Sequence, residues 1–220
     1  LAAVAMAGGE LELLVVDRDT GQPVAVRMHL KNQRGRVQRQ RRLPFWHDHF
    51  AVDGRAVLKL PNGSYTFEIE RGPEYKLVTG QFIIRQGAED NKAVEMQRFV
   101  DMKKEGWWSG DLHLQRPLHD IPLLMLAEDL HVAPVVTWHQ DGDKWSHKRA
   151  RAPWLRHFDG DRYYHKLSGK FTSEAAQFLA LHGKPAWVAG NPDKSLTPVL
   201  RLLDPSFRLE SVDPAVTTTL

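Results

Sequence analysis

An antiparallel β-sandwich followed by an α/β region is the fold class that this sequence predicts, and three observations lead to it. From residue 10 to about residue 100, apolar and polar residues alternate, and clusters of Gly, Pro, Asn and Asp separate the runs. From about residue 101 the pattern changes to a strand-like run, a helical run and a second apolar run. The chain has 220 residues, 42% of them apolar, which is enough for a packed core.

The alternating part predicts short strands joined by turns, which is typical of an antiparallel sandwich of about ninety residues. Tyr65, Phe67 and Ile69 would face the core, with Thr66 and Glu68 facing water. Because these strands can close a core of their own, we expect this part to fold by itself. The predicted strands are residues 11–16, 24–30, 56–60, 64–70, 76–84 and 92–97.

The second region predicts a strand–helix–strand unit. Residues 107–114 have a strand pattern, residues 118–130 a helical pattern interrupted by Pro122, and residues 132–137 form the apolar run of a buried parallel strand. Farther along, the sequence predicts a helix at 172–182 and a strand at 185–189.

Composition changes divide the chain into five parts. Residues 1–9 resemble the end of a secretory signal peptide, with a small-x-small pattern at Ala5–Ala7 that predicts export to the periplasm or the extracellular space. The parts are a signal-peptide remnant (1–9), the sandwich domain (10–100), a linker (101–106), the α/β region (107–190) and an irregular tail (191–220).

Charge and residue counts exclude several classes of protein. With no cysteine, the chain has neither disulfides nor thiolate metal sites. Its 30 Lys and Arg exceed its 27 Asp and Glu by three, a weak argument for nucleic acid, and we interpret the arginine-rich run 34–42 as a solvated loop. No apolar run is long enough to span a membrane. The chain has 11 histidines, and their crowding over residues 113–165 favours metal or proton chemistry.

The candidate site residues come from the strand–helix–strand unit. On a strand, Asp111, His113 and Gln115 share one face, and residues 137–140 at the end of the next predicted strand place His139 beside His113. Glu128 lies on the connecting helix. Imidazole and carboxylate ligands suit a divalent ion, so we predict a metal site of His113, His139, Asp111 and Glu128.

A second histidine pair offers a weaker hypothesis. His47 and His49 are two residues apart and would be suited to a metal if they lay on a strand. In the long polar segment in which they occur, we favour surface residues instead.

Three segments of the second region resemble the CehA/McbA family of metallohydrolases, which belongs to the polymerase-and-histidinol-phosphatase (PHP) superfamily. Two further segments resemble the N-terminal sandwich of that family, an Ig-like or carboxypeptidase-regulatory-like module. The catalytic-domain segments are residues 106–113, 127–130 and 137–139, and the sandwich segments are residues 60–65 and 71–75.

The resemblance implies a partial PHP-type (β/α) barrel. It implies a Zn, Mn or Fe ion that activates water to attack an ester or phosphoester. His113 falls on the first histidine of the family's His-x-His motif, and His139 on the histidine of its Asp-His motif. Asp111 and Glu128 would then be the catalytic acids.

Two functions therefore remain open. The first is a metal-dependent hydrolase acting on a small molecule or a glycan. The alternative is an exported binding or interaction protein with a vestigial metal site. Gln115 and Trp138 favour the alternative, because they stand where the family has a histidine and an aspartate.

Overall fold

The computed structural model describes residues 8–141, 144–147, 150–172 and 177–181. The chain forms two compact units. The first, here called the sandwich unit, runs to Gly110 and also contains Pro117–Val132; the second contains Asp111–Arg116 and the residues from Ala133 onward. The predicted boundaries put residues 117–132 in the second region, whereas in the structure they belong to the sandwich unit.

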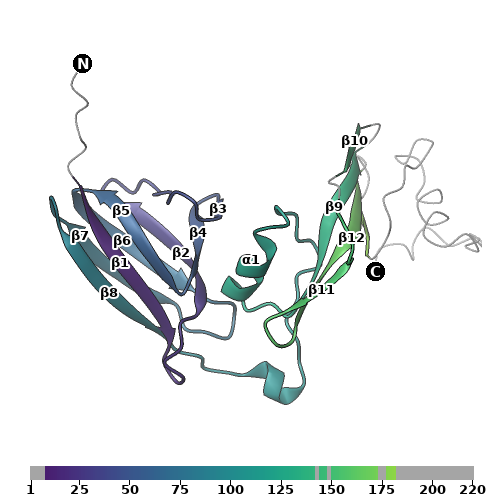
Figure 1. Ribbon diagram of the computed structural model, residues 1–220, viewed down its shortest axis with the longest axis horizontal. Helices are drawn as coiled ribbons and strands as arrows, with labels where there is room; N and C mark the ends of the chain where they lie inside the picture. The colour runs from purple at the N-terminus through teal and green to yellow at the C-terminus, as the bar shows by residue number, and fades with distance from the viewer. Residues whose placement is uncertain (1–7, 142–143, 148–149, 173–176, 182–220) are drawn as a thin grey trace, which may run out of the picture. The chain divides into compact units, whose positions relative to one another are not determined.

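The sandwich unit has two β-sheets facing each other (Figure 1). In the three-stranded sheet, β1 pairs antiparallel with β5 and parallel with β8. In the five-stranded sheet, all neighbours are antiparallel. The sheet orders are β5 (Arg55–Pro61), β1 (Gly8–Asp17), β8 (Glu89–Met96), and β3 (Phe45–Trp46), β4 (His49–Asp53), β2 (Ala25–Asn32), β6 (Gly63–Glu70), β7 (Val78–Ile84).

The core between the sheets follows the alternation in the sequence. Tyr65, Phe67 and Ile69 are buried, while Thr66 and Glu68 are exposed, as predicted. The core cluster draws apolar side chains from both sheets and lies wholly between Leu11 and Met96. The β-sandwich and its six predicted strands are thus confirmed, but the sandwich is not wholly antiparallel as predicted, since β1 and β8 pair in parallel.

The helix α1 (Ile121–Ala127) packs on the outer face of β2 and β4. Two alanines, Ala25 and Ala51, point outward there and are buried beneath it. Their small side chains let the helix come close to the strands. The apolar side chains that α1 contributes to this contact are Ala127, Leu123, Leu124 and Leu126.

The second unit is built mainly from β-hairpins. The described antiparallel pairings are β9 with β10, β11 with β12, and β12 with β13. Trp138 of β9 is buried against Phe171 of β12, with ring centroids 5.1 Å apart. The strands are β9 (Val132–Asp141), β10 (Lys144–His147), β11 (Leu155–Phe158), β12 (Arg162–Thr172) and β13 (Gln177–Ala180).

The predicted strand at 107–114 is wrong. Gly110 and Leu114 each make an isolated parallel bridge, with Val132 and Val135, and the residues between them form a turn. The Asp111 carboxylate accepts a hydrogen bond from the backbone N–H of His113 at 2.8 Å. A short polar side chain that satisfies nearby backbone groups in this way competes with strand pairing.

Other predictions for this region have mixed outcomes. The helix at 118–130 is confirmed over the seven residues of α1, and β9 confirms the strand at 132–137. The helix predicted at 172–182 is wrong where it is described, because residues 177–180 form β13 and pair with β12. The strand at 185–189, the tail from residue 191 and residues 1–7 of the signal-peptide remnant lie outside the described residues.

The partial (β/α) barrel is not what the structure shows. The described residues contain one α-helix, and it packs on the sandwich. A (β/α) barrel instead needs a helix after each strand. No helix in the described ranges has the length and apolar character needed to cross a bilayer.

Candidate functional site

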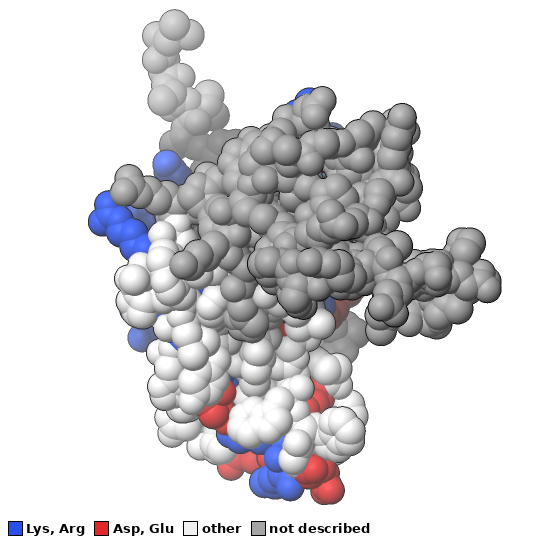
Figure 2. All heavy atoms as spheres, turned by 90° about the vertical axis from the view of Figure 1, so that its right-hand side faces the viewer, with Lys and Arg blue, Asp and Glu red and all other residues white. Residues whose placement is uncertain are grey.

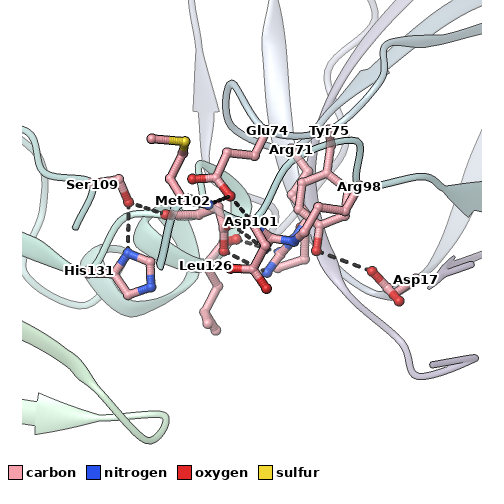
Figure 3. Close-up of polar contacts among 12 residues, drawn as sticks. Asp17, Arg71, Glu74, Tyr75, Arg98, Asp101, Met102, Ser109, Leu126 and His131 are labelled. Atoms are coloured by element: carbon pink, nitrogen blue, oxygen red, sulfur yellow. Dashed lines mark hydrogen bonds and ion pairs between the residues drawn. The ribbon is translucent and has the colours of Figure 1, made fainter. Parts of the chain in front are cut away.

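One buried arginine, Arg71, and one half-buried arginine, Arg98, hold the end of α1 against the sandwich (Figure 3). Asp129 is 3% exposed, and its carboxylate accepts hydrogen bonds from Arg71 at 3.1 Å and from Arg98 at 2.6 Å. Arg71 also donates to the carbonyl oxygens of Ala25 and Leu126, both at 2.6 Å. The Asp129 carboxylate therefore connects the end of α1 to the segments after β6 and β8, and Arg71 extends the connection to β2.

Tyr75 lies at the centre of this arrangement. The guanidinium carbon of Arg98 lies 4.4 Å from the centroid of the Tyr75 ring, and that of Arg71 lies 5.2 Å from it. Burial alone would lower the pKa of Arg98, but the charge and hydrogen bond of Asp129 outweigh it and raise that pKa. Arg98 also forms an ion pair with Glu74. These ion pairs and ring contacts form a structural network around Tyr75.

The Tyr75 hydroxyl donates to Asp17 at 3.2 Å, which extends the network to the end of β1. The same carboxylate accepts hydrogen bonds from the backbone N–H groups of Asp19 and Thr20, at 3.1 and 2.9 Å, and from the Thr20 hydroxyl at 3.0 Å. Burial raises the pKa of Asp17, but these hydrogen bonds more than offset it, and the pKa lies below its ordinary value.

This lowered pKa predicts how Asp17→Asn changes the pH dependence of stability. A depressed carboxyl pKa stabilises the fold above the unfolded value of about 3.9, and the contribution is lost as the pH falls through the folded value. We expect the variant to be about 1 kcal/mol less stable at neutral pH. The difference should shrink in acid, as measured by urea unfolding at neutral pH and at about pH 2.5. An equal difference at both pH values would contradict this assignment.

Glu128, one of the predicted acids, takes part in an ion pair. Its carboxylate lies 2.9 Å from Arg27, which also pairs with Glu70. Burial lowers the pKa of Arg27, but the hydrogen bond that Arg27 donates to Glu70 and the charges of Glu128 and Glu70 outweigh it and raise that pKa. In this structure the contact of Glu128 is with an arginine on β2.

The other predicted ligands lie in the second unit. Asp111 and His113 share the turn described above, and His113 is exposed. His139 is half-buried on β9 and lies four residues beyond Val135, the bridge partner of Leu114. A metal ion shared by His113 and His139 stays a prediction, as does the bound metal itself.

A group of three potential metal ligands occurs elsewhere, on the outer face of the five-stranded sheet. It consists of His29, Asp48 and His49, whose ligand atoms all lie within 4.8 Å of one another. His29 on β2 is directly opposite His49 on β4, and their ring centroids are 5.0 Å apart. The Asp48 carboxylate lies 3.3 Å from Nδ1 of His29 and 3.0 Å from Nδ1 of His49.

The electrostatics of this group favour a neutral imidazole beside an ionised carboxylate. Burial lowers the pKa of His49, and the hydrogen bond to Asp48 only partly offsets this. The hydrogen bond from His49 lowers the pKa of Asp48. Neutral imidazole and ionised carboxylate are the forms in which these side chains bind metals.

The sequence contains only part of the signal for this group. The sequence hypothesis pairs His49 with His47 as metal ligands on one strand. In the structure, however, His47 lies in the turn before β4 and has a positive φ of 50°. The partner that matters is His29, which is twenty residues away in the sequence. The alternation along β2 does indicate that His29 points outward, whereas its pairing with His49 depends on the register.

A second feature of the sandwich unit is a run of exposed aromatic side chains from residue 99 to residue 108. We call these residues the aromatic segment; it includes the short 3₁₀ helix η1 (Met102–Glu105). Its exposed aromatic residues are Trp107 (66%), Phe99 (58%) and Trp108 (54%).

The indole of Trp108 has a defined support. Its ring meets His131 edge-on at 5.2 Å, and Lys103 lies 5.4 Å from its centroid. Ser109 connects this segment to the residues after α1. Its hydroxyl donates to the carbonyl oxygen of Asp129 at 2.5 Å and lies 2.8 Å from Nδ1 of His131. In Figure 2, uncharged surface lies among basic and acidic side chains at the lower end of the molecule, where η1 lies in Figure 1.

No protein-family model matches the chain, and no curated protein matches it. Among solved structures, it is similar to the Bacillus anthracis TIE protein (23% identity, 52% of this chain and 20% of that one, TM-score 0.33). It is also similar to the group B streptococcus pilus 2b backbone protein (19%, 41% and 41%, 0.32) and to BcpA, the major pilin subunit of Bacillus cereus (13%, 42% and 30%, 0.30). The match covers less than half of each of these chains.

The predicted membership of the CehA/McbA family is wrong. No family model matches the chain, and the described residues form β-sheets with one α-helix instead of the (β/α) barrel of that family. The second of the family's three matching segments, residues 127–130, belongs to the sandwich unit, where Glu128 and Asp129 bind arginines. The first of these segments, residues 106–113, begins directly after η1 and contains turns and one bridge instead of a barrel strand. The hydrolase function was implied by this resemblance and therefore loses that support.

Proposed function

We propose that this chain is an exported binding protein, and that the aromatic segment of its sandwich unit is the surface that contacts the partner. Export follows the Ala5–Ala7 pattern of the sequence. The observation that carries the proposal is the pair of neighbouring indoles, Trp107 and Trp108, both more than half exposed. Large aromatic side chains left in water are a mark of interaction surfaces, where they contribute most of the binding energy.

The segment is suited to a polysaccharide. An indole offers a flat apolar face for the C–H face of a sugar ring. Charged side chains that can bond to hydroxyl groups lie beside it, at Lys103, Lys104 and Glu105. Because the contacts of Ser109 and His131 fix the backbone next to Trp108, little conformational freedom is lost on binding.

The test is retention of the purified full chain on insoluble cellulose, chitin and peptidoglycan. We expect retention on at least one of them and a loss of at least tenfold in affinity for the double variant Trp107→Ala/Trp108→Ala, since truncating a central interface tryptophan costs about 2 kcal/mol or more. Quenching of tryptophan fluorescence by the soluble oligosaccharide of the same polymer provides a second readout.

Trp46→Ala is the matched control. Trp46 lies on β3, is 51% exposed and is not part of the aromatic segment. We expect this variant to bind as the wild type does. If no polysaccharide retains the wild type, or if Trp46→Ala weakens binding as much as the double variant does, the aromatic segment is not a polysaccharide-binding surface.

A further inference from the structure

We propose that His29, Asp48 and His49 bind one divalent transition-metal ion on the outer face of β2 and β4. This site is separate from the aromatic segment, and its existence does not depend on the proposed polysaccharide binding. All three residues belong to the sandwich unit.

The backbone brings the three side chains together. In the register of β2 with β4, His29 is paired directly with His49, so both imidazoles rise from the same face of the sheet. The left-handed conformation of His47 turns the chain into β4 and leaves Asp48 immediately before the strand. The carboxylate then lies against both rings, within 3.3 Å of each Nδ1.

The distances match what an ion requires. A zinc ion binds imidazole nitrogen at about 2.0–2.1 Å, and tetrahedral geometry places two such ligands about 3.3 Å apart. The two carboxylate–imidazole distances, 3.0 and 3.3 Å, already have this spacing. The widest separation among the ligand atoms is within 4.8 Å, so a small rotation of one ring completes the site.

The other nitrogen of His29 provides independent support. Nε2 of His29 is buried and has no hydrogen-bond partner in the structure. It faces the carboxylate of Glu70 at 3.9 Å, just beyond hydrogen-bond distance. A metal on Nδ1 fixes the proton on Nε2, which can then donate to Glu70. Metal-binding histidines commonly have such a carboxylate behind them.

The ligand set indicates the class of ion. Two imidazoles and one carboxylate suit Zn²⁺, Co²⁺, Ni²⁺ or Cu²⁺, whereas Ca²⁺ and Mg²⁺ prefer oxygen ligands alone. The Asp48 side chain is 49% exposed, so water can reach the ion from that side. Arg27 is the nearby cation, and its charge is already paired with Glu70 and Glu128.

The test uses the full chain without an affinity tag, because a histidine tag would bind the same ions. Titration with Co²⁺ followed by visible d–d absorption, and calorimetry with Zn²⁺, should show one saturable site. We expect His29→Gln and His49→Gln each to weaken binding at least tenfold, and Glu70→Gln to weaken it about 10- to 100-fold. Urea unfolding without metal shows whether each variant is folded; if His29→Gln is not, Asp48→Asn replaces it.

His47→Gln is the matched control, since it changes a histidine in the same hairpin that does not belong to the group. It should bind metal as the wild type does. The proposal is overturned if the wild type shows no saturable binding, or if His47→Gln weakens binding as much as His49→Gln does. It is overturned as well if replacing His113 or His139, and not His29, removes the ion.

Discussion

Replacing Asp129 by alanine should destabilise the sandwich unit by about 3–5 kcal/mol. The carboxylate is 3% exposed and is shared by Arg71 and Arg98, so its removal leaves two guanidinium groups partly or wholly buried without it. Removing one partner of a buried ion pair is costly because the remaining charge keeps its desolvation penalty. Urea unfolding of the full chain, followed by circular dichroism, measures the change.

Two variants separate this effect from the loss of an ordinary surface ion pair. Asp129→Asn keeps the size of the side chain but removes its charge, and we expect it to recover only part of the stability. Lys104→Ala removes the exposed ion pair with Asp101 but keeps the hydrogen bond from the backbone N–H of residue 104 to Asp101, and it should cost less than about 1 kcal/mol. If Asp129→Ala is no more harmful than Lys104→Ala, the buried network does not stabilise the fold.

Gly72→Ala should also be strongly destabilising, with its effect concentrated at α1. Gly72 has a φ of +51°, which costs a residue with a side chain about 1–2 kcal/mol. A Cβ there would also lie 2.5 Å from the carbonyl oxygen of Glu128. This contact is with backbone, so it can be relieved only by moving the end of α1 away from the strands. We expect faster amide exchange in α1 together with the lower stability.

Gly35→Ala is the control for the conformational cost of a positive φ. Gly35 has a similar φ of +72°, but a Cβ there would meet nothing within 4 Å. It should therefore show the conformational cost alone and leave amide exchange in α1 unchanged. Equal losses for the two variants would mean that the close approach of Gly72 to Glu128 has no energetic role.

The strands of the sandwich could be predicted because most of them alternate between buried inward-facing residues and more exposed outward-facing residues. Alternation identifies Tyr65, Phe67 and Ile69 as inward-facing whatever the partner strand is, and all three are buried. The burial of residues on the outer face could not be predicted in the same way. Ala25 and Ala51 are buried only because α1 packs on them, and α1 comes from more than sixty-five residues later in the chain.

The site predictions depended on two local structures that did not form as expected. Residues 107–114 were expected to present Asp111 and His113 on one strand face, but turn bonding by Asp111 prevents it. Glu128 was expected beside these residues and instead contacts Arg27. The group of His29, Asp48 and His49 requires the pairing of two strands joined by a long arginine-rich segment, and nothing in the local sequence specifies that register.

The division of the chain has a mechanical consequence. The backbone passes between the two units three times, at residues 110–111, 116–117 and 132–133. Two of these passages, those at Gly110 and Val132, leave the sandwich unit side by side and in the same direction, joined by a parallel bridge. A force pulling the units apart is therefore divided among several segments. Within the sandwich unit, the segments that end at Gly110 and Val132 are held together by the hydrogen bonds of Ser109, His131 and Asp129.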